Sequence, residues 1–249
     1  MEQASVQKDK NRELAMSVLE HLDELRKRLM IIAAILLVAT VTCFFFVADI
    51  LAFLTAPAEN MQLIYIAPAE AFVSQIRLAI ISSIIITLPL TFYQVLLFVL
   101  PALKKAEKKA VLPFVFIMFI LFGLGISFAY YVVLPFALLF FLGFSTDGLT
   151  AQITITSYIS FVTSFIMAFG MVFQIPLIFW FLGAIGLVSS EFLRINRKYA
   201  ILVIAIVSAI ITPPDVFSQL LMIGPLLILY ELGVFLIRLT ERGRARQER

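Results

Sequence analysis

The chain has 249 residues, of which 62% are hydrophobic and only 14% charged, with a formal net charge of +3 and a mean hydropathy of +1.06. Soluble domains are typically about 45–50% apolar and about 25% charged, so a bilayer must be the solvent for most of this chain. The single cysteine, Cys43, excludes an intramolecular disulfide, and the single histidine, His21, excludes a multi-histidine metal site.

The first predicted element is a helix that begins at Ser17, because Ser17 and Glu20 have the spacing of a capping box. Its apolar stripe, at helical spacing, consists of Val18, Leu22, Leu25 and Leu29. Acidic and basic residues four positions apart form two pairs, which are Asp23–Lys27 and Glu24–Arg28. Such pairs stabilise a solvated helix face by about 0.2–0.5 kcal/mol each. The segment 1–29 is therefore predicted to hold an amphipathic helix that lies against the membrane or the helix bundle.

Six apolar runs follow, and a membrane-spanning helix needs about 20 such residues. In chain order they are Met30–Leu54, Ala71–Leu100, Ala110–Phe144, Tyr158–Leu187, Tyr199–Ile211 and Val216–Leu239. A helix as short as the fifth run covers about 20 Å, against a hydrocarbon core of about 30 Å. The last two runs therefore form either two short crossings or a re-entrant hairpin. We favour two crossings, because the sixth run is long enough to span by itself.

The distribution of Lys and Arg predicts the orientation. All of them except Arg77 lie in four segments: before the first run, after the second, after the fourth, and from Arg238 at the end of the sixth run onward. The other three connections contain acidic residues and no Lys or Arg. Since cytoplasmic segments carry the excess of positive charge, we predict six crossings with both termini in the cytoplasm. The chain is then one membrane domain, 1–249, with a membrane region over 30–239 and a tail over 240–249 whose basic residues attract anionic lipid.

Five prolines lie inside or at the edges of the apolar runs: Pro89, Pro113, Pro135, Pro176 and Pro225. Each removes a helix hydrogen bond and bends its helix. The predicted fold is therefore all-α, a polytopic membrane protein whose kinked helices form a curved wall.

Two common classes of polytopic membrane protein are secondary transporters and intramembrane enzymes, and the sequence argues against both. The two halves differ in span length and loop charge, which counts against the inverted-repeat transporters. A metal, nucleotide or nucleophile–base motif is absent from the sequence, which counts against an enzyme and predicts no cofactor.

Three polar residues fall at membrane depth, where such residues usually face protein or a wet cavity. Arg77 is expected to extend toward the interface, and Glu231 to be neutral or paired. Gln174 lies within a turn of Pro176 and is expected to face a cavity or another helix.

Two acids on the predicted cytoplasmic side are candidates for binding a cation. Glu107 is the one acid among four lysines between the second and third runs, and Glu24 lies on the first helix. Each has a simple alternative, which is charge balance on a solvated surface. Together they would form an anionic spot within a basic surface.

Several segments resemble the TatC family in family order along nearly the whole chain. They are HLDELRKRL (His21–Leu29), Ala56–Pro57, YQVLLFVLPAL (Tyr93–Leu103) with Glu107 four residues on, FAYYVVLP (Phe128–Pro135), AFGMVFQIP (Ala168–Pro176), ITPPDVFSQ (Ile211–Gln219) and YELGVFLIR (Tyr230–Arg238). The resemblance implies a glove-shaped wall of six transmembrane helices with short fifth and sixth helices. It also implies the core, signal-receptor subunit of the twin-arginine translocase, which moves folded proteins across the cytoplasmic membrane.

The resemblance implies partners and residue roles as well. The partners are twin-arginine signal peptides, TatA- and TatB-type single-span subunits, further copies of the chain and the lipid bilayer, without nucleic acid. Signal-peptide contacts are expected at Glu24 and Glu107, with His21, Leu25, Arg26 and Phe98 shaping the same patch. Roles in transport or partner contact are expected for Pro57, Tyr130, Gln174, Asp215 and Glu231. At position 174 Glu is also common in the family, and Gln174 cannot ionise.

Overall fold

A computed structural model describes residues 2–58, 63–99, 111–143, 152–211 and 216–247. The helices, in chain order, are α1 (Glu2–Phe45), α2 (Val47–Thr55), the 3-10 turn η1 (Ala56–Ala58), α3 (Pro68–Val99), α5 (Val111–Phe128), the π-helical turn η3 (Ala129–Val133), α6 (Leu134–Leu142), α7 (Ile155–Val172), α8 (Ile175–Ala184), α9 (Ser190–Ile195), α10 (Arg197–Ile211) and α11 (Val216–Gln247). Two short strands, β1 (Leu63–Ile64) and β2 (Ile153–Thr154), pair in parallel. The predicted all-α fold is confirmed apart from this small strand pair.

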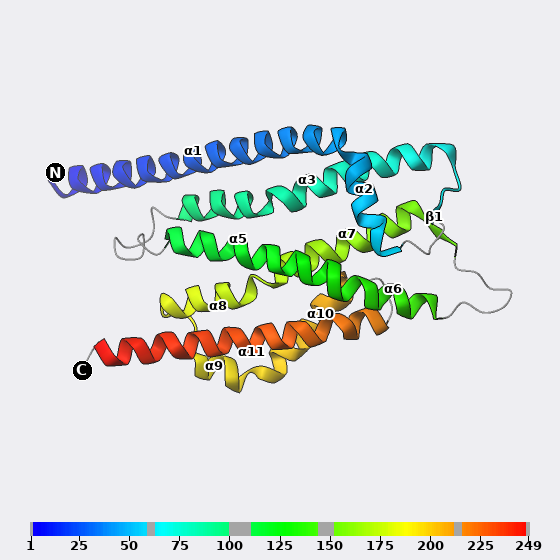
Figure 1. Ribbon diagram of the computed structural model, residues 1–249. Helices are drawn as coiled ribbons and strands as arrows, with labels where there is room; N and C mark the ends of the chain where they lie inside the picture. Colours follow the sequence, from blue (N-terminus) through cyan, green and yellow to red (C-terminus); the bar gives the residue numbers. More distant parts are fainter. Residues whose placement is uncertain (1, 59–62, 100–110, 144–151, 212–215, 248–249) are drawn as a thin grey trace.

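The long helices lie side by side as a wall (Figure 1). Helix α1 packs along α3, α3 and α5 pack on α7, and α8 and α10 pack on α11. The start of α1 and the end of α11 lie at the same end of the wall (Figure 1), which agrees with two termini on one side of a membrane.

The region up to the end of the first run differs from the sequence prediction in two respects. The predicted helix start at Ser17 is wrong, because α1 is continuous from Glu2 to Phe45. Residues before Ser17 are rich in Ala, Glu, Gln, Lys and Arg, which favour helix, so the capping-box spacing lies inside a helix. The run Met30–Leu54 is also not one helix: Phe46 leaves helical geometry (φ −101°, ψ 16°) and α2 turns away from α1 (Figure 1).

Two prolines divide the third and fourth runs, as their chemistry predicts. The π-helical turn η3 directly precedes Pro135, and there the Leu134 N–H reaches back to the Ala129 carbonyl. The fourth run breaks at Phe173 and Gln174, and Pro176 lies in the first turn of α8. A proline is tolerated in a first turn, where its missing N–H has no helical partner anyway. Pro89 and Pro225, in contrast, lie inside α3 and α11.

Helix lengths test the predicted crossings. Among the described residues, five helical segments are long and apolar enough to span a membrane: Glu20–Phe45, Pro68–Phe98, Pro113–Leu142, Ile155–Ala184 and Val216–Glu241. The expected short fifth element is confirmed, since α10 has 15 residues, and its crossing stays a prediction. The expectation of a short sixth helix is wrong, because α11 has 32 residues. The helix continues beyond the apolar run into the basic C-terminal segment and ends at Gln247.

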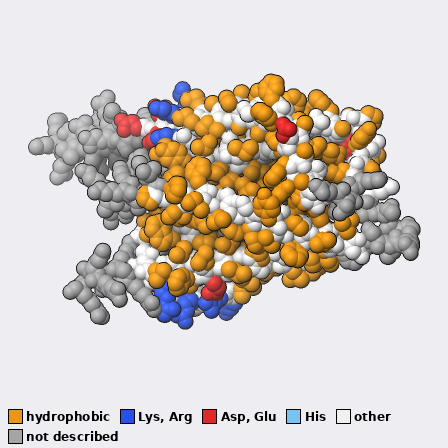
Figure 2. Space-filling view, viewed as in Figure 1, with side chains coloured by type: hydrophobic (Ala, Val, Ile, Leu, Met, Phe, Trp, Pro, Cys, Tyr) orange, Lys and Arg blue, Asp and Glu red, His pale blue; other side chains and the backbone are white. Residues whose placement is uncertain are grey.

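The surface is that of a membrane protein. Large apolar side chains are widely exposed, with Phe45 at 80% and Ile210 at 77% exposure. Figure 2 shows hydrophobic atoms covering most of the visible face, with Lys and Arg gathered toward one end. The buried core centres on α7, where Tyr158, Phe165 and Phe169 are almost fully enclosed.

A labelling experiment tests the orientation. Cysteines at Lys104 and Arg244 are expected to react with an impermeant reagent only from the cytoplasmic side, and one at Asp147 only from the other side, because basic segments stay in the cytoplasm. The parent chain supplies the background, since its Cys43 is buried. Reaction of the Asp147→Cys chain from the cytoplasm would contradict the predicted topology.

Candidate functional site

Two of the predicted signal-binding residues, His21 of α1 and Phe98 of α3, meet where α1 packs against the end of α3. We call His21, Glu24, Leu25, Arg26 and Phe98 the α1–α3 patch. His21 of α1 stacks on Phe98 of α3, with ring centroids 4.2 Å apart and planes inclined by 22°. Leu25 and Arg26 are exposed, and Glu24 is half-buried. The tertiary structure therefore brings together residues that the sequence separates by more than seventy positions.

Arg28 joins the two helices beside this patch. Its Nη1 donates to Gln94 Oε1 of α3 at 3.1 Å, and its Nη2 donates to Glu24 Oε1 at 3.2 Å. The predicted Glu24–Arg28 pair within α1 is thus present, and the same guanidinium links it to α3 through Gln94. For Asp23–Lys27, no ion pair is found in the described part of the chain. Sequence reasoning missed Gln94, because an amide in an apolar run carries no periodic signal.

Glu107 and Asp215 lie outside the described residues. The assignment of Glu107 to the same patch therefore stays a prediction, as does any role for Asp215.

At the opposite end of the wall, Tyr130 anchors α2. Tyr130 is buried in the π-helical turn, and its hydroxyl donates to the Phe53 carbonyl at 2.6 Å while its ring stacks on Phe53 at 4.3 Å. Tyr158 of α7 donates in the same way to the Leu54 carbonyl at 2.7 Å. These bonds tie two carbonyls in the last turn of α2 to η3 and α7. Pro57 follows in η1 and is half-buried. The contacts of Tyr130 thus fix the shape of the segment that carries Pro57.

Glu231 is paired, as the sequence prediction allowed. Its Oε2 accepts from Arg197 Nη2 at 2.7 Å, and both side chains are about half exposed, at 50% and 49%. The neighbouring Tyr230 hydroxyl donates to the Leu193 carbonyl at 2.8 Å. Together these contacts fasten the α9–α10 segment to α11. Arg77 is exposed, in agreement with a side chain that extends toward an interface.

Gln174 is buried, with 3% exposure, at the junction of α7 and α8. Its Nε2 donates to the Met118 carbonyl of α5 at 3.3 Å and to the Gly170 carbonyl at 3.4 Å. Its Oε1 is buried and has no hydrogen-bond partner among the described residues. Gln174 also lines a cavity of about 140 Å³ between α3, α5 and α8, so the predicted placement against a cavity and another helix is confirmed.

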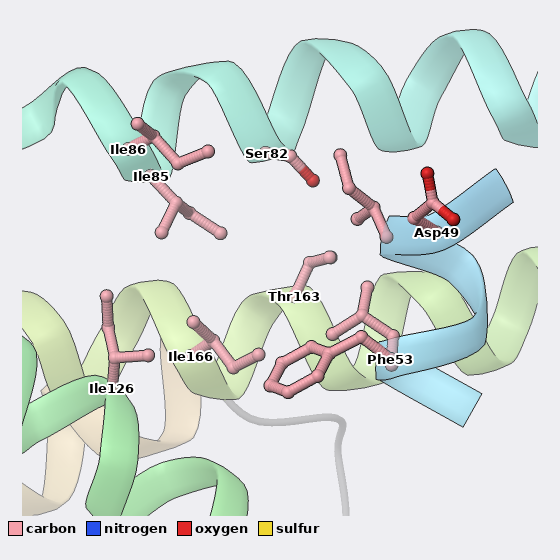
Figure 3. A pocket seen from close by; sticks show the side chains of 10 residues that line it. Asp49, Phe53, Ser82, Ile85, Ile86, Ile126, Thr163 and Ile166 are labelled. Atoms are coloured by element: carbon pink, nitrogen blue, oxygen red, sulfur yellow. The ribbon is translucent and has the colours of Figure 1, made fainter. Parts of the chain in front are cut away.

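A larger groove, of about 400 Å³, lies between α2, α3 and α7 (Figure 3). Isoleucines from α3, α5 and α7 make its walls, and Asp49, Ser82 and Thr163 are its polar groups. Phe53 forms part of the wall, so Tyr130 supports this groove through its stacking contact. Such a surface suits an apolar chain or helix with few polar groups.

The described residues contain no group of three or more His, Cys, Asp or Glu side chains placed to hold a metal ion. Two of the predicted site residues offer polar groups: Glu24 has a carboxylate for charge-assisted hydrogen bonding, and Gln174 has an amide within the wall.

Comparisons with known proteins agree along most of the chain. The family model described as "Sec-independent protein translocase protein (TatC)" matches residues 20–225. A Sec-independent protein translocase protein TatC from Helicobacter pylori strain J99 is 42% identical over 220 residues, which is 88% of each chain. The Escherichia coli K12 protein of the same description is 36% identical over 237 residues, covering 93% of this chain and 92% of that one.

A solved structure shares the fold. The crystal structure of a "Twin Arginine Translocase Receptor- TatC" superimposes with a TM-score of 0.80 at 37% identity, covering 89% of this chain and 99% of that chain. Both the sequence and the fold therefore place this chain, a transport protein rather than an enzyme, in the TatC family of Sec-independent protein translocases.

Proposed function

We propose that this chain is the receptor and core subunit of a twin-arginine translocase. It binds twin-arginine signal peptides at the cytoplasmic end of the wall and organises the transport of folded proteins. The observation that carries the proposal is the Glu24 carboxylate, which is held at the α1–α3 patch with one oxygen bound to Arg28. A carboxylate accepts the planar fork of an arginine through two parallel hydrogen bonds, a geometry that lysine cannot match.

The remaining parts of the patch suit a peptide. The stacked His21–Phe98 pair offers an apolar surface beside Glu24, and Leu25 is 36% exposed next to it. Glu107 is proposed as the second acid for the arginine pair, on the basis of the family resemblance. Because the surrounding residues are mostly basic and repel a cationic signal, the signal arginines bind favourably only at acids such as Glu24 and Glu107.

Partners and location follow from the same proposal. The chain resides in the cytoplasmic membrane with both termini in the cytoplasm, in complexes with TatA- and TatB-type single-span subunits and further copies of itself. Two apolar cavities with isolated polar groups, the one beside Gln174 and the one beside Asp49, support contacts with apolar helices. Tyr130 and Glu231 are proposed to act in transport by positioning α2 and α10, since each makes a contact that fixes those elements.

A binding measurement tests the receptor function. The purified full-length chain in lipid nanodiscs is titrated with a fluorescent signal peptide that carries Arg-Arg, and with the same peptide carrying Lys-Lys. Affinity for the Arg-Arg peptide is expected to be higher by about tenfold or more, which corresponds to about 1.4 kcal/mol. Equal affinity for the two peptides would contradict a twin-arginine receptor.

Substitutions of Gln174 test a role in transport. Gln174→Leu is expected to insert and to bind signal peptide normally, because the hydrogen bonds of Gln174 go to α5 and α7 and not to the α1–α3 patch, but to export folded cargo poorly. Gln174→Glu is expected to retain export, since a protonated carboxyl can replace the amide as donor to the Met118 carbonyl. Signal cross-linking and cargo export are compared at matched protein levels.

The hydrogen bonds of Gln174 also allow a purely structural role. In that case Gln174→Leu leaves two buried carbonyls with one donor fewer, and signal binding falls together with export. Full export by the Leu variant would remove Gln174 from the transport mechanism.

A further inference from the structure

Arg28 makes an unusual pair of contacts beside the proposed signal site. Each terminal nitrogen of its guanidinium has a separate acceptor, Gln94 Oε1 for Nη1 and Glu24 Oε1 for Nη2. Its Nε is buried without a hydrogen-bond partner among the described residues. The side chain is only 23% exposed, so Arg28 belongs to the α1–α3 seam rather than to the open surface.

These contacts involve only one oxygen of Glu24. Oε1 accepts from Arg28, whereas no described group donates to Oε2. The Glu24 side chain retains 29% exposure, so its carboxylate is not enclosed by the α1–α3 seam. A carboxylate oxygen also has a second lone pair, which allows Oε1 to accept another donor while Arg28 stays in place.

We infer that Arg28 and Gln94 are positioning residues for the signal-binding carboxylate, an inference that rests on the proposed function. Gln94 anchors the guanidinium on α3, and the guanidinium in turn orients the Glu24 carboxylate so that Oε2 faces an incoming signal arginine. The pair on α1 alone is a weak, mobile i, i+4 contact. The anchor on the second helix restricts it to one geometry, which is the condition for selecting the planar fork of arginine over lysine.

A competing role for Arg28 leads to the opposite result. If Arg28 occupied the place of the signal arginine, its removal would free Glu24 and tighten peptide binding. The geometry disfavours this competition, because Arg28 is anchored in the seam and contacts only one carboxylate oxygen.

The test uses the ratio of affinities for the Arg-Arg and Lys-Lys peptides in full-length chains in nanodiscs. Gln94→Leu changes no charge, and it is expected to weaken Arg-Arg binding by about three- to tenfold while leaving Lys-Lys binding unchanged. Arg28→Gln is expected to lower the same ratio. Arg28→Lys keeps the positive charge but loses the planar guanidinium fork, so it is also expected to lower the ratio of Arg-Arg to Lys-Lys affinity.

Lys27→Gln is the matched control for the lost positive charge, because Lys27 is exposed on the same helix next to Arg28. In Lys27→Gln, the ratio of Arg-Arg to Lys-Lys affinity is expected to equal that of the unmodified chain. An unchanged ratio in Gln94→Leu, or tighter Arg-Arg binding in Arg28→Gln, would overturn the positioning role. If the unmodified chain itself shows no preference for Arg-Arg, the proposed receptor function fails instead, so the two failures are distinguishable.

Discussion

Replacing Gly125 by Ala is expected to prevent the normal packing of α5 on α7. A Cβ atom at this buried position would lie 2.5 Å from the Phe169 carbonyl oxygen, 3.0 Å from the carbonyl carbon and 3.0 Å from Phe173 Cβ. Two of these atoms belong to the backbone of α7, so a side-chain rotation cannot relieve the overlap and the helices must separate. Overpacking of this kind typically costs about 1–3 kcal/mol, and occasionally more.

The measurement is the thermal unfolding midpoint in detergent, together with the amount of inserted, monodisperse protein. Gly123→Ala is the matched control, because it lies two residues away on the same helix and its Cβ would meet nothing within 4 Å. In an exposed helical position Ala is favoured over Gly by about 1 kcal/mol, so the control is expected to be neutral or stabilising. Equal midpoints for the two variants would show that α5 and α7 do not approach each other as the structure has it.

Removing the charge of Glu24 is expected to produce the largest loss of signal binding. In Glu24→Gln the side chain keeps its shape and an oxygen that can accept from Arg28, but it no longer offers a charged, two-oxygen acceptor to a guanidinium. A hydrogen bond to a charged group contributes about 1.5–3 kcal/mol, which corresponds to roughly ten- to a hundredfold in affinity. Glu107→Gln is expected to have an effect of the same size.

Titration with the Arg-Arg signal peptide measures the effect, and Asp23→Asn is the control. Asp23 is exposed beside Glu24 on α1 and makes no ion pair with a described residue, so its variant is expected to bind within about twofold of the unmodified chain. Normal binding by both glutamate variants would reject the assignment of the receptor site. A comparable loss in Asp23→Asn would mean that net charge, rather than a specific carboxylate, attracts the peptide.

Much of this protein was predictable from local sequence patterns. Long apolar runs indicate a membrane environment, because each spanning helix must satisfy its own backbone hydrogen bonds and expose apolar side chains to lipid. The π-helical turn before Pro135 and the break near Pro176 follow from the missing N–H of each proline. The short α10 follows from the length of its apolar run, and the possibility of a pair for Glu231 follows from the cost of an uncompensated charge at membrane depth.

Other local patterns predicted wrongly because several conformations satisfy them equally. The capping-box spacing at Ser17 is compatible with the middle of a long helix, and α1 extends to Glu2. The end of the last apolar run did not end α11, since charged residues of good helix propensity continue it to Gln247.

The sequence by itself therefore determined the solvent, the order of the helices and the irregular turns at Pro135 and Pro176, all of which depend on neighbours within one or two helical turns. Only the tertiary structure decided which polar groups meet: Arg28 with Gln94 across 66 positions, Tyr130 with the Phe53 carbonyl across 77, and Gln174 with the Met118 carbonyl across 56. Such contacts depend on how the helices cross and which faces they turn to one another. That choice is made by the packing of many apolar side chains at once, and single apolar runs of similar composition do not distinguish between the alternatives.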